Sequence, residues 1–301
     1  MKILITGGSG FIGSHVAELY QGRAEIVVLD DFRTGHRANL EGLDCRVIEG
    51  SILDRELLAE AMEGVDLVFH LAALVSVPES VEKPGDTVAI NVNGLLNVLG
   101  TARDAGARKL VFASSAAVYG ENPQQPKVET MAPDPRSPYA ITKLDGEYYC
   151  GLYAREGWLP TACLRFFNVF GPRQDPGSAY AAAVPIFLDR ARKGEPIAIH
   201  GDGGQTRDFI YVKDIAGALA FVAEDTEIEG VFNAGYGGSI TIRELVDEIL
   251  RLTGSQSEVV HSPPRAGDIR HSTSDASKLL GAGWQPAYTQ ATGLAEMIYK
   301  P

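Results

Sequence analysis

The sequence predicts an α/β fold in which helices cover both faces of a doubly wound parallel sheet, followed by a smaller C-terminal lobe. Two observations support the sheet: apolar strands alternate with helical segments through the first half of the 301-residue chain, and a glycine-rich turn directly follows the first strand. A third observation supports the lobe, because the alternation loosens after about residue 170. We therefore expect a large domain over residues 1–170 and a lobe over residues 171–301, with some later elements rejoining the large domain.

The alternation can be followed along the chain. Strands are expected at residues 2–6, 25–29, 46–48, 67–70, 109–113 and 161–166, and helices from Phe11, over 53–62, over 88–105 and from Tyr139. This spacing predicts βαβ units with parallel strands. In the lobe, helices are expected around 181–192, over 212–223 and over 242–252, the last capped by Thr241, with a strand at 197–199 and coil over 261–267.

Composition and charge exclude several classes of function. The net charge of -12 argues against a nucleic-acid or anionic-membrane surface, so any anionic substrate must be held by local arginines or lysines. No apolar run is long enough to cross a bilayer, and the first apolar run is too short for a signal peptide. Cys45, Cys150 and Cys163 are odd in number and widely spaced, which predicts a reducing, cytoplasmic setting. The histidines show no ligand spacing, so no metal is expected.

The glycine-rich turn has the pattern of a dinucleotide-binding loop. Gly7 allows a tight turn, Gly10 lets a pyrophosphate approach the backbone at a helix N-terminus, and Gly13 lets the helix pack on the strand. Asp30 ends the second strand, where its carboxylate can accept hydrogen bonds from an adenosine ribose. An acid there favours NAD over NADP because it would repel a 2′-phosphate, although Arg33 lies close by. The alternative is a structural turn with a solvated acidic strand end.

A tyrosine and a lysine four residues apart, Tyr139 and Lys143, fall on one face of a predicted helix. The ammonium is expected to favour the phenolate, so that Tyr139 can act as a base near neutral pH. The alternative is an ordinary surface pair. Ser114 and Ser115 follow a strand and lie at the carboxyl edge of the sheet. We expect Ser115 to bridge Tyr139 and a substrate oxygen, and Ser114 to satisfy backbone groups.

With these motifs in place, the chain resembles the extended short-chain dehydrogenase/reductases of the NAD-dependent epimerase/dehydratase family, and within them the UDP-hexose 4-epimerases of the UDP-N-acetylglucosamine type. Matching motifs span nearly the whole sequence, at residues 6–13, 70–73, 91–94, 114–120, 137–143, 164–172, 207–210, 265–268 and 283–284. The resemblance implies a Rossmann-like fold, NAD as cofactor and a UDP-sugar as substrate. It also implies a homodimer, in which the helices over 88–105 and from Tyr139 pair with their copies.

The resemblance further implies roles for individual residues. Tyr139 would be the acid/base, Ser115 its relay, and Lys143 would tune Tyr139 and hold the nicotinamide ribose. The cofactor would contact Gly7, Gly10, Phe11, Ile12, Gly13, Asp30, Asp31, Phe32, Thr34, Gly35, Ser51, Ile52, Leu71, Ala72, Ala73, Val75, Asn91, Tyr139, Lys143 and Phe167. Ser51 departs from the family pattern, which has an aspartate near the adenine. The UDP-sugar would contact Ser115, Tyr139, Asn168, Ala183, Val184, Arg207, Arg265, Asp268 and Ser272.

Arginine suits this substrate on physical grounds, because a diphosphate needs charge-assisted donors that an acidic protein must supply locally. For Arg207 the alternative is a salt bridge to Asp208 or Asp214.

The residues after Ser115 bear on the choice of reaction. Similar dehydratases carry Thr-Asp-Glu there and decarboxylases a glutamate, whereas this chain has Ala116 and Ala117. Without an extra acid, return of a hydride to the other face of a 4-keto sugar remains, which inverts C4. In the family that the chain resembles, the position of Ser272 faces the hexose, and galactose-restricted members carry a bulky tyrosine there. The resemblance therefore implies that the small Ser272, with the small residues over 179–184, leaves room for an N-acetyl group, so UDP-GlcNAc/UDP-GalNAc is expected alongside UDP-Glc/UDP-Gal. The alternatives are a UDP-glucuronate 4-epimerase, a dehydratase or reductase, or a non-catalytic NAD-binding sensor.

Overall fold

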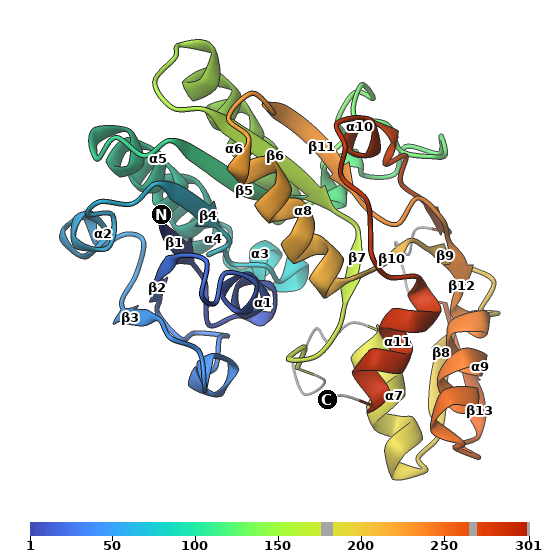
Figure 1. Ribbon diagram of the computed structural model, residues 1–301. Coiled ribbons are helices and arrows are strands. Elements are labelled where there is room, and N and C mark those ends of the chain that lie inside the picture. The colour runs from blue at the N-terminus through green and yellow to red at the C-terminus, as the bar shows by residue number, and fades with distance from the viewer. Residues whose placement is uncertain (176–182, 265–269, 300–301) are drawn as a thin grey trace.

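The computed structural model describes residues 1–175, 183–264 and 270–299, and its centre is a seven-stranded parallel sheet (Figure 1). The strand order is β11-β6-β5-β4-β1-β2-β3. The strands are β1 (Lys2–Thr6), β2 (Glu25–Asp30), β3 (Arg46–Glu49), β4 (Leu67–His70), β5 (Lys109–Ser115), β6 (Thr161–Phe166) and β11 (Gly230–Ala234). The order reverses between β1 and β4, so the sheet is doubly wound. This arrangement confirms the predicted Rossmann-like class.

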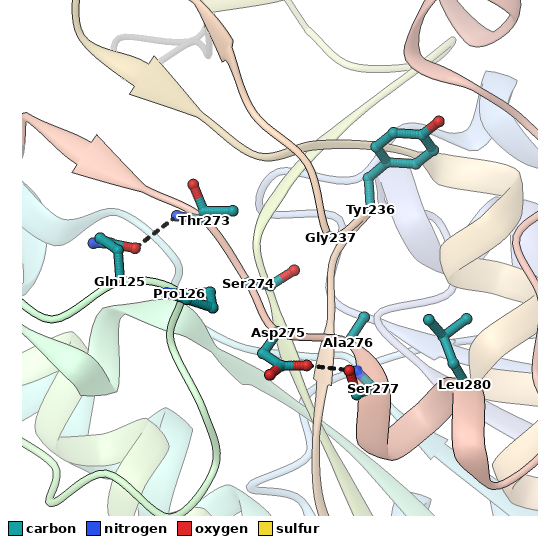
Figure 2. Close-up of a pocket in the computed structure, with 10 residues that line it drawn as sticks. All are labelled: Gln125, Pro126, Tyr236, Gly237, Thr273, Ser274, Asp275, Ala276, Ser277 and Leu280. Carbon is teal, nitrogen blue, oxygen red and sulfur yellow. Dashed lines mark hydrogen bonds between the residues drawn. The ribbon is translucent and has the colours of Figure 1, made fainter.

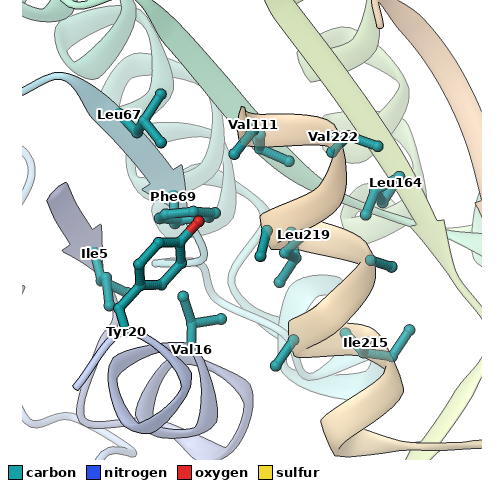
Figure 3. Packing of buried hydrophobic residues seen from close by; sticks show 14 of the residues in the cluster. Ile5, Val16, Tyr20, Leu67, Phe69, Val111, Leu164, Ile215, Leu219 and Val222 are labelled. Atoms are coloured by element: carbon teal, nitrogen blue, oxygen red, sulfur yellow. The ribbon is translucent and has the colours of Figure 1, made fainter. Parts of the chain in front are cut away.

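Two apolar cores lie on opposite faces of the sheet. Neighbouring residues of β1 show the separation, because Ile3 and Ile5 enter one core and Leu4 the other. The first core packs against α1 (Phe11–Leu19) and α8 (Val212–Glu224), and Figure 3 shows residues of α8 facing those of the strands. The second core packs against α2 (Arg55–Ala61), α5 (Gly94–Asp104) and α6 (Pro138–Arg155). Strands covered on both sides explain the apolar runs of the sequence.

The single helix expected over residues 88–105 is wrong in its detail. The region contains α4 (Pro84–Val88), a π-helical turn η2 (Ala89–Asn93) and then α5. The side-chain amide of Asn91, inside the π turn, bonds to the backbone N–H of Leu74 at 2.8 Å and to its carbonyl at 3.0 Å. It also bonds to the Thr142 hydroxyl. The wider turn carries an amide that holds neighbouring segments together.

The elements after residue 170 are divided between the large sheet and the lobe. β11 pairs with β6, and α8 packs on the sheet, so both lie with the large domain. Around a third apolar core lie α7 (Ala183–Lys193), β8 (Ile197–His200), α9 (Ile242–Thr253), β13 (Val259–Ser262) and α11 (Gln290–Tyr299). The coil expected over 261–267 is wrong at its start, because β13 pairs in parallel with β8 through residue 262. Residues 265–267 lie outside the described residues.

Short elements connect the two parts of the molecule. β7 (Asn168–Phe170) pairs with β10 (Phe209–Tyr211), and β9 (Thr206–Arg207) lies between β12 (Ile240–Thr241) and β14 (His271–Ser272). The remaining elements are η1 (Arg37–Leu40), α3 (Val77–Glu82), η3 (Ala116–Tyr119) and α10 (Ser277–Gly281). Thr241 caps α9 as predicted, in a reciprocal capping box with Glu244. Within the described ranges, no helix has the length and apolar character needed to span a membrane.

The packing of α8 on the sheet yields a stability prediction. Leu219 is fully buried in the first core, as Figure 3 shows. Leu219→Ala should lower the free energy of unfolding by about 2–5 kcal/mol, because it leaves a cavity. Leu53→Ala is the control: Leu53 is 41% exposed, and its truncation should cost no more than about 0.5 kcal/mol. Urea unfolding at one protein concentration measures both. Equal costs for the two variants would contradict this description of the core.

Candidate active site

A cleft of about 690 Å³ runs along the carboxyl ends of the central strands. Its lining comes from the glycine-rich turn after β1, the end of β2, residues 71–75 after β4, the end of β5, the first turns of α6 and residues 173–175. The carboxyl edge of a parallel sheet is where such folds bind ligands, particularly where the strand order reverses. Here the turns after β1 and β4 flank the reversal.

The glycine-rich turn is held by close backbone contacts. Gly7 has φ 73°, and a β-carbon there would lie 2.7 Å from the Ala72 backbone nitrogen. A β-carbon at Gly13 would lie 2.3 Å from the Gly7 carbonyl oxygen. At Gly10 only that same carbonyl lies within 4 Å, at 3.2 Å, so the side facing the cleft is open. No side chain caps the first turn of α1, which leaves its N–H groups able to bind an anion.

Asp30 lies at the end of β2 on the wall of the cleft. Its carboxylate accepts hydrogen bonds from the backbone N–H groups of Ser9 at 2.9 Å and Phe32 at 2.8 Å. Each oxygen keeps a further lone pair, so a ribose hydroxyl can still be accepted. The nearby Arg33 forms an ion pair with Glu79 on α3. That pairing removes the sequence feature that counted against NAD.

Ser115, Tyr139 and Lys143 converge on the cleft from β5 and α6. Ser137 caps α6 by accepting the N–H of Ala140 at 3.2 Å, which places Tyr139 in the first helical turn. The Lys143 ammonium donates to the Ala113 carbonyl at 2.7 Å and lies 5.8 Å from the centre of the Tyr139 ring. Burial lowers the pKa of Lys143 to about 8. One turn of helix thus brings an ammonium beside the tyrosine ring.

The direction of the Tyr139 pKa differs from the expectation. Burial raises the pKa of this phenol above its ordinary value, and a hydrogen bond with Ser115 only partly opposes the shift. Desolvation penalises the phenolate more strongly than its neighbours favour it. Tyr139 therefore holds its proton at neutral pH in the protein alone. Ser115 has a second contact, because its hydroxyl oxygen accepts the N–H of Ala117 at 3.1 Å.

Ser114 belongs to a buried polar network beneath the cleft. Its hydroxyl was expected to satisfy backbone groups, and this expectation is wrong. Its hydroxyl donates to Glu147, which forms a two-point salt bridge with Arg165 at 2.8 and 2.7 Å. The Arg165 guanidinium lies 4.7 Å from the centre of the Tyr119 ring, and the Tyr119 hydroxyl donates to Asn233. The residue next to Ser115 is thereby tied to α6, β6 and β11.

Most of the residues predicted to bind the cofactor line this cleft. They are Gly7, Gly10, Phe11, Ile12, Gly13, Asp30, Asp31, Thr34, Gly35, Ser51, Ile52, Leu71, Ala72, Ala73, Val75, Tyr139, Lys143 and Phe167. Two predicted residues are not in the lining. The side-chain amide of Asn91 forms hydrogen bonds with Leu74 and Thr142. The Arg37 guanidinium lies over the Phe32 ring, 4.2 Å from its centre.

Several lining residues were not predicted, among them Asn39, Arg173 and Gln174. Asn39 donates to the Ser9 carbonyl at 2.8 Å. Arg173 has φ 65° and pairs with Glu18 of α1 at 2.7 Å, while its Nη1 atom is buried without a hydrogen-bond partner. Two of these lining residues could have been found from the sequence, because the polar pair Arg173–Gln174 lies in a Gly-Pro loop directly after a strand.

Of the residues predicted to bind the sugar nucleotide, Asn168, Arg207 and Ser272 lie together on short strands, whereas Ser115 and Tyr139 line the cofactor cleft. The Asn168 side chain donates to the Asp208 carbonyl at 3.1 Å, and Arg207 on β9 lies opposite Ser272 on β14. Arg207 donates to the Thr206 carbonyl at 2.8 Å. Ala183 and Val184 begin α7, with Val184 buried in the lobe core. The predicted Arg265 and Asp268 lie outside the described residues.

The two aspartates considered as partners of Arg207 have other contacts. Asp208 accepts from Ser274 and from the backbone after β11. Asp214 accepts from the backbone N–H groups of Ala287 and Tyr288.

The donor set of the cleft fits a dinucleotide. An uncapped helix N-terminus and the open side of Gly10 suit a pyrophosphate, and Asp30 suits ribose hydroxyls. The unpartnered Arg173 nitrogen adds a buried donor on the same wall. Ser115, Tyr139 and Lys143 at the opposite part of the cleft can exchange a proton with a hydroxyl or keto oxygen.

Comparison with known proteins agrees with this geometry. The model of the NAD dependent epimerase/dehydratase family matches residues 3–235. A putative UDP-glucose 4-epimerase of Methanocaldococcus jannaschii is 37% identical over 299 residues, which cover 98% of this chain and 97% of that protein.

Two solved structures are closely similar. The UDP-N-acetylglucosamine 4-epimerase of Methanobrevibacter ruminantium, in complex with UDP-N-acetylmuramic acid, has a TM-score of 0.95 at 38% identity, covering 99% of this chain and 96% of that one. The UDP-glucose 4-epimerase of Thermus thermophilus, in complex with NAD, has a TM-score of 0.90 at 38% identity, covering 99% and 98%. NAD is accordingly the cofactor of this protein, an enzyme of the isomerase class, and the chain belongs to the NAD-dependent epimerase/dehydratase family.

Proposed function

We propose that this protein is a UDP-sugar 4-epimerase that inverts C4 of the hexose through a 4-keto intermediate. The observation that carries the proposal is the convergence of Ser115, Tyr139 and Lys143 on one cleft with the glycine-rich turn. We further propose that UDP-GlcNAc and UDP-GalNAc are substrates, alongside UDP-Glc and UDP-Gal. The cytoplasm, where nucleotide sugars and reduced thiols coexist, fits the three free cysteines.

The residues of the cleft have separable tasks in this reaction. When bound, NAD supplies the reversible hydride acceptor that oxidation and reduction at C4 require. Tyr139 takes the C4 hydroxyl proton and returns it to the keto oxygen, with Ser115 as hydrogen-bonding relay. The raised pKa of Tyr139 suits the returning step, in which it acts as an acid. Lys143 adds the positive charge that favours the phenolate in the first step.

The residues next to Ser115 support epimerisation over elimination of water or loss of a carboxyl group. Ala116 and Ala117 occupy the turn η3 directly after β5, at the positions where similar dehydratases and decarboxylases carry acids.

We also propose that the enzyme is a homodimer formed through α6 and the segment of α3, α4 and α5. Ile141 and Tyr148, seven residues apart on α6, are 47% and 62% exposed. Val81 and Val88 from α3 and α4, which pack beside α6, are 62% and 46% exposed. Large apolar side chains gathered on neighbouring helices are typical of a surface covered by a partner, here a second copy.

Replacement of the proposed acid/base tests catalysis. Tyr139→Phe should lower kcat by on the order of 10²–10⁴-fold, because general acid–base catalysis contributes about this much. Retained cofactor, measured by absorbance of the denatured protein's supernatant, should be unchanged. Tyr149→Phe, a partly buried tyrosine on the same helix, is the control and should keep full activity. Full activity of Tyr139→Phe would refute the assignment.

The substrate range is tested at Ser272. Ser272→Tyr should lower kcat/KM for UDP-GlcNAc and UDP-GalNAc by at least about tenfold relative to UDP-Glc and UDP-Gal, because a large ring occupies the space of the acetyl group. Ser272→Ala, which stays small, should keep both activities. Steady-state rates on the four sugars decide the matter. A Ser272→Tyr variant with undiminished activity on acetylated sugars would show that this residue does not select the substrate.

The dimer is tested by a charge on the exposed face of α6. Tyr148→Glu should convert the dimer to a monomer at micromolar concentration, because it places a carboxylate in an apolar interface. Tyr299→Glu changes a tyrosine that is 65% exposed on α11, away from this face, and should leave the dimer intact. Sedimentation velocity reports the mass of each. A monomeric native protein, or two variants that behave alike, would contradict the proposed interface.

A further inference from the structure

A buried carboxylate joins the strands that carry the proposed substrate contacts. Asp208 is fully buried between β9 and β10. One carboxylate oxygen accepts the Tyr236 N–H at 2.8 Å. The other accepts the Gly237 N–H at 3.2 Å, the Ser274 N–H at 3.0 Å and the Ser274 hydroxyl at 2.5 Å. In Figure 2, Ser274 lies between Thr273 and the segment Tyr236–Gly237, the second source of donors.

The backbone of the same residue holds two of the residues expected to contact the UDP-sugar. The Asp208 N–H donates to the Ser272 carbonyl at 2.9 Å. Its carbonyl accepts the Asn168 N–H at 3.0 Å and the Asn168 side chain at 3.1 Å. A third such residue, Arg207, directly precedes Asp208. The segments that carry Asn168, Arg207 and Ser272 therefore meet at Asp208.

The strands at this point are too short to fix their own positions. β9 and β14 are two residues long, and their pairing consists of Thr206 with His271 and Arg207 with Ser272. Ladders this short are marginal without further contacts. The four hydrogen bonds to the Asp208 carboxylate supply those contacts. Two come from Tyr236 and Gly237, just after β11 of the large sheet, and two come from Ser274, just after β14.

The packing around the carboxylate leaves no room for adjustment. A β-carbon at Gly235 would lie 2.3 Å from the Ser274 hydroxyl oxygen and 2.9 Å from a carboxylate oxygen of Asp208. An amide in place of the carboxylate would fit by shape, but its NH₂ group would face N–H donors. Shape alone therefore does not satisfy the site, which needs four acceptor positions on two oxygens.

We infer that Asp208 is a positioning residue for the sugar-nucleotide site. Through its hydrogen bonds to the segments after β14 and after β11, it holds Arg207 and Ser272 in position relative to Asn168. This inference rests on the proposed function, under which Asn168, Arg207 and Ser272 belong to the residues expected to contact the UDP-sugar. Asp208 touches neither the cofactor cleft nor Tyr139. Its loss should therefore weaken binding of the sugar nucleotide and spare the chemical step and the cofactor.

The test compares Asp208→Asn with a matched control, Asp214→Asn, in the purified holoenzyme. Asp214 is also a buried carboxylate that accepts two backbone N–H groups, from Ala287 at 2.7 Å and Tyr288 at 3.2 Å, but these hold the segment before α11. Asp208→Asn should raise KM for the UDP-sugar and Kd for UDP, measured by calorimetry, about tenfold, which corresponds to about 1.4 kcal/mol of binding. It should leave kcat within about twofold, and Asp214→Asn should change neither constant.

A milder variant covers failure of Asp208→Asn to fold. Ser274→Ala removes one of the four donors and should raise Kd for UDP by a smaller factor, with cofactor content unchanged. Unchanged Kd and KM in the folded variants, or an equal rise in Asp214→Asn, would overturn the inference. Wild-type protein that binds UDP but converts no UDP-sugar would refute the epimerase and leave the Asp208 test intact. Wild-type protein that does not bind UDP would refute both.

Discussion

The packing of α6 on β5 is the contact on which the cleft depends. Gly146 makes it possible, because a β-carbon there would lie 2.4 Å from the Phe112 ring. With the helix this close, the Lys143 ammonium reaches the Ala113 carbonyl at 2.7 Å. Tyr139, one turn earlier on α6, then lies beside Ser115 at the end of β5. The buried salt bridge of Glu147 and Arg165 joins the same helix to β6.

The two proposed binding regions are built by different means. The cofactor cleft is formed by long, buried strands and by glycine contacts, so its shape follows from the core of the large domain. The sugar-nucleotide region is formed by strands of two or three residues at the entrance to the lobe. Side-chain hydrogen bonds help to hold such strands in place, and those to the fully buried Asp208 are an example.

Local pattern accounts for most of the large domain. Apolar runs bounded by turns predicted β1 and β4 to the residue, and the glycine spacing predicted the turn between β1 and α1. β11 was not among the predicted strands, because its pairing with β6 joins segments some seventy residues apart that no periodicity connects. Asn91 was assigned to the cofactor from its motif, whereas the π turn directs its amide to Leu74. The helical spacing predicted the neighbourhood of Tyr139 and Lys143, but the direction of the Tyr139 pKa depends on burial, which spacing does not reveal.

On the proposed function, the cleft that holds NAD inverts C4 of a UDP-hexose without net oxidation. An assay of the purified protein, with no NAD added, against UDP-GalNAc, UDP-Gal and UDP-GlcA, with products resolved by NMR, puts this to the test. We expect UDP-GalNAc to convert to UDP-GlcNAc and UDP-Gal to UDP-Glc, each to an equilibrium mixture, because the hydride returns and the cofactor ends as it began. Conversion of UDP-GlcA alone, or the accumulation of a keto, dehydrated or decarboxylated sugar, would contradict the account.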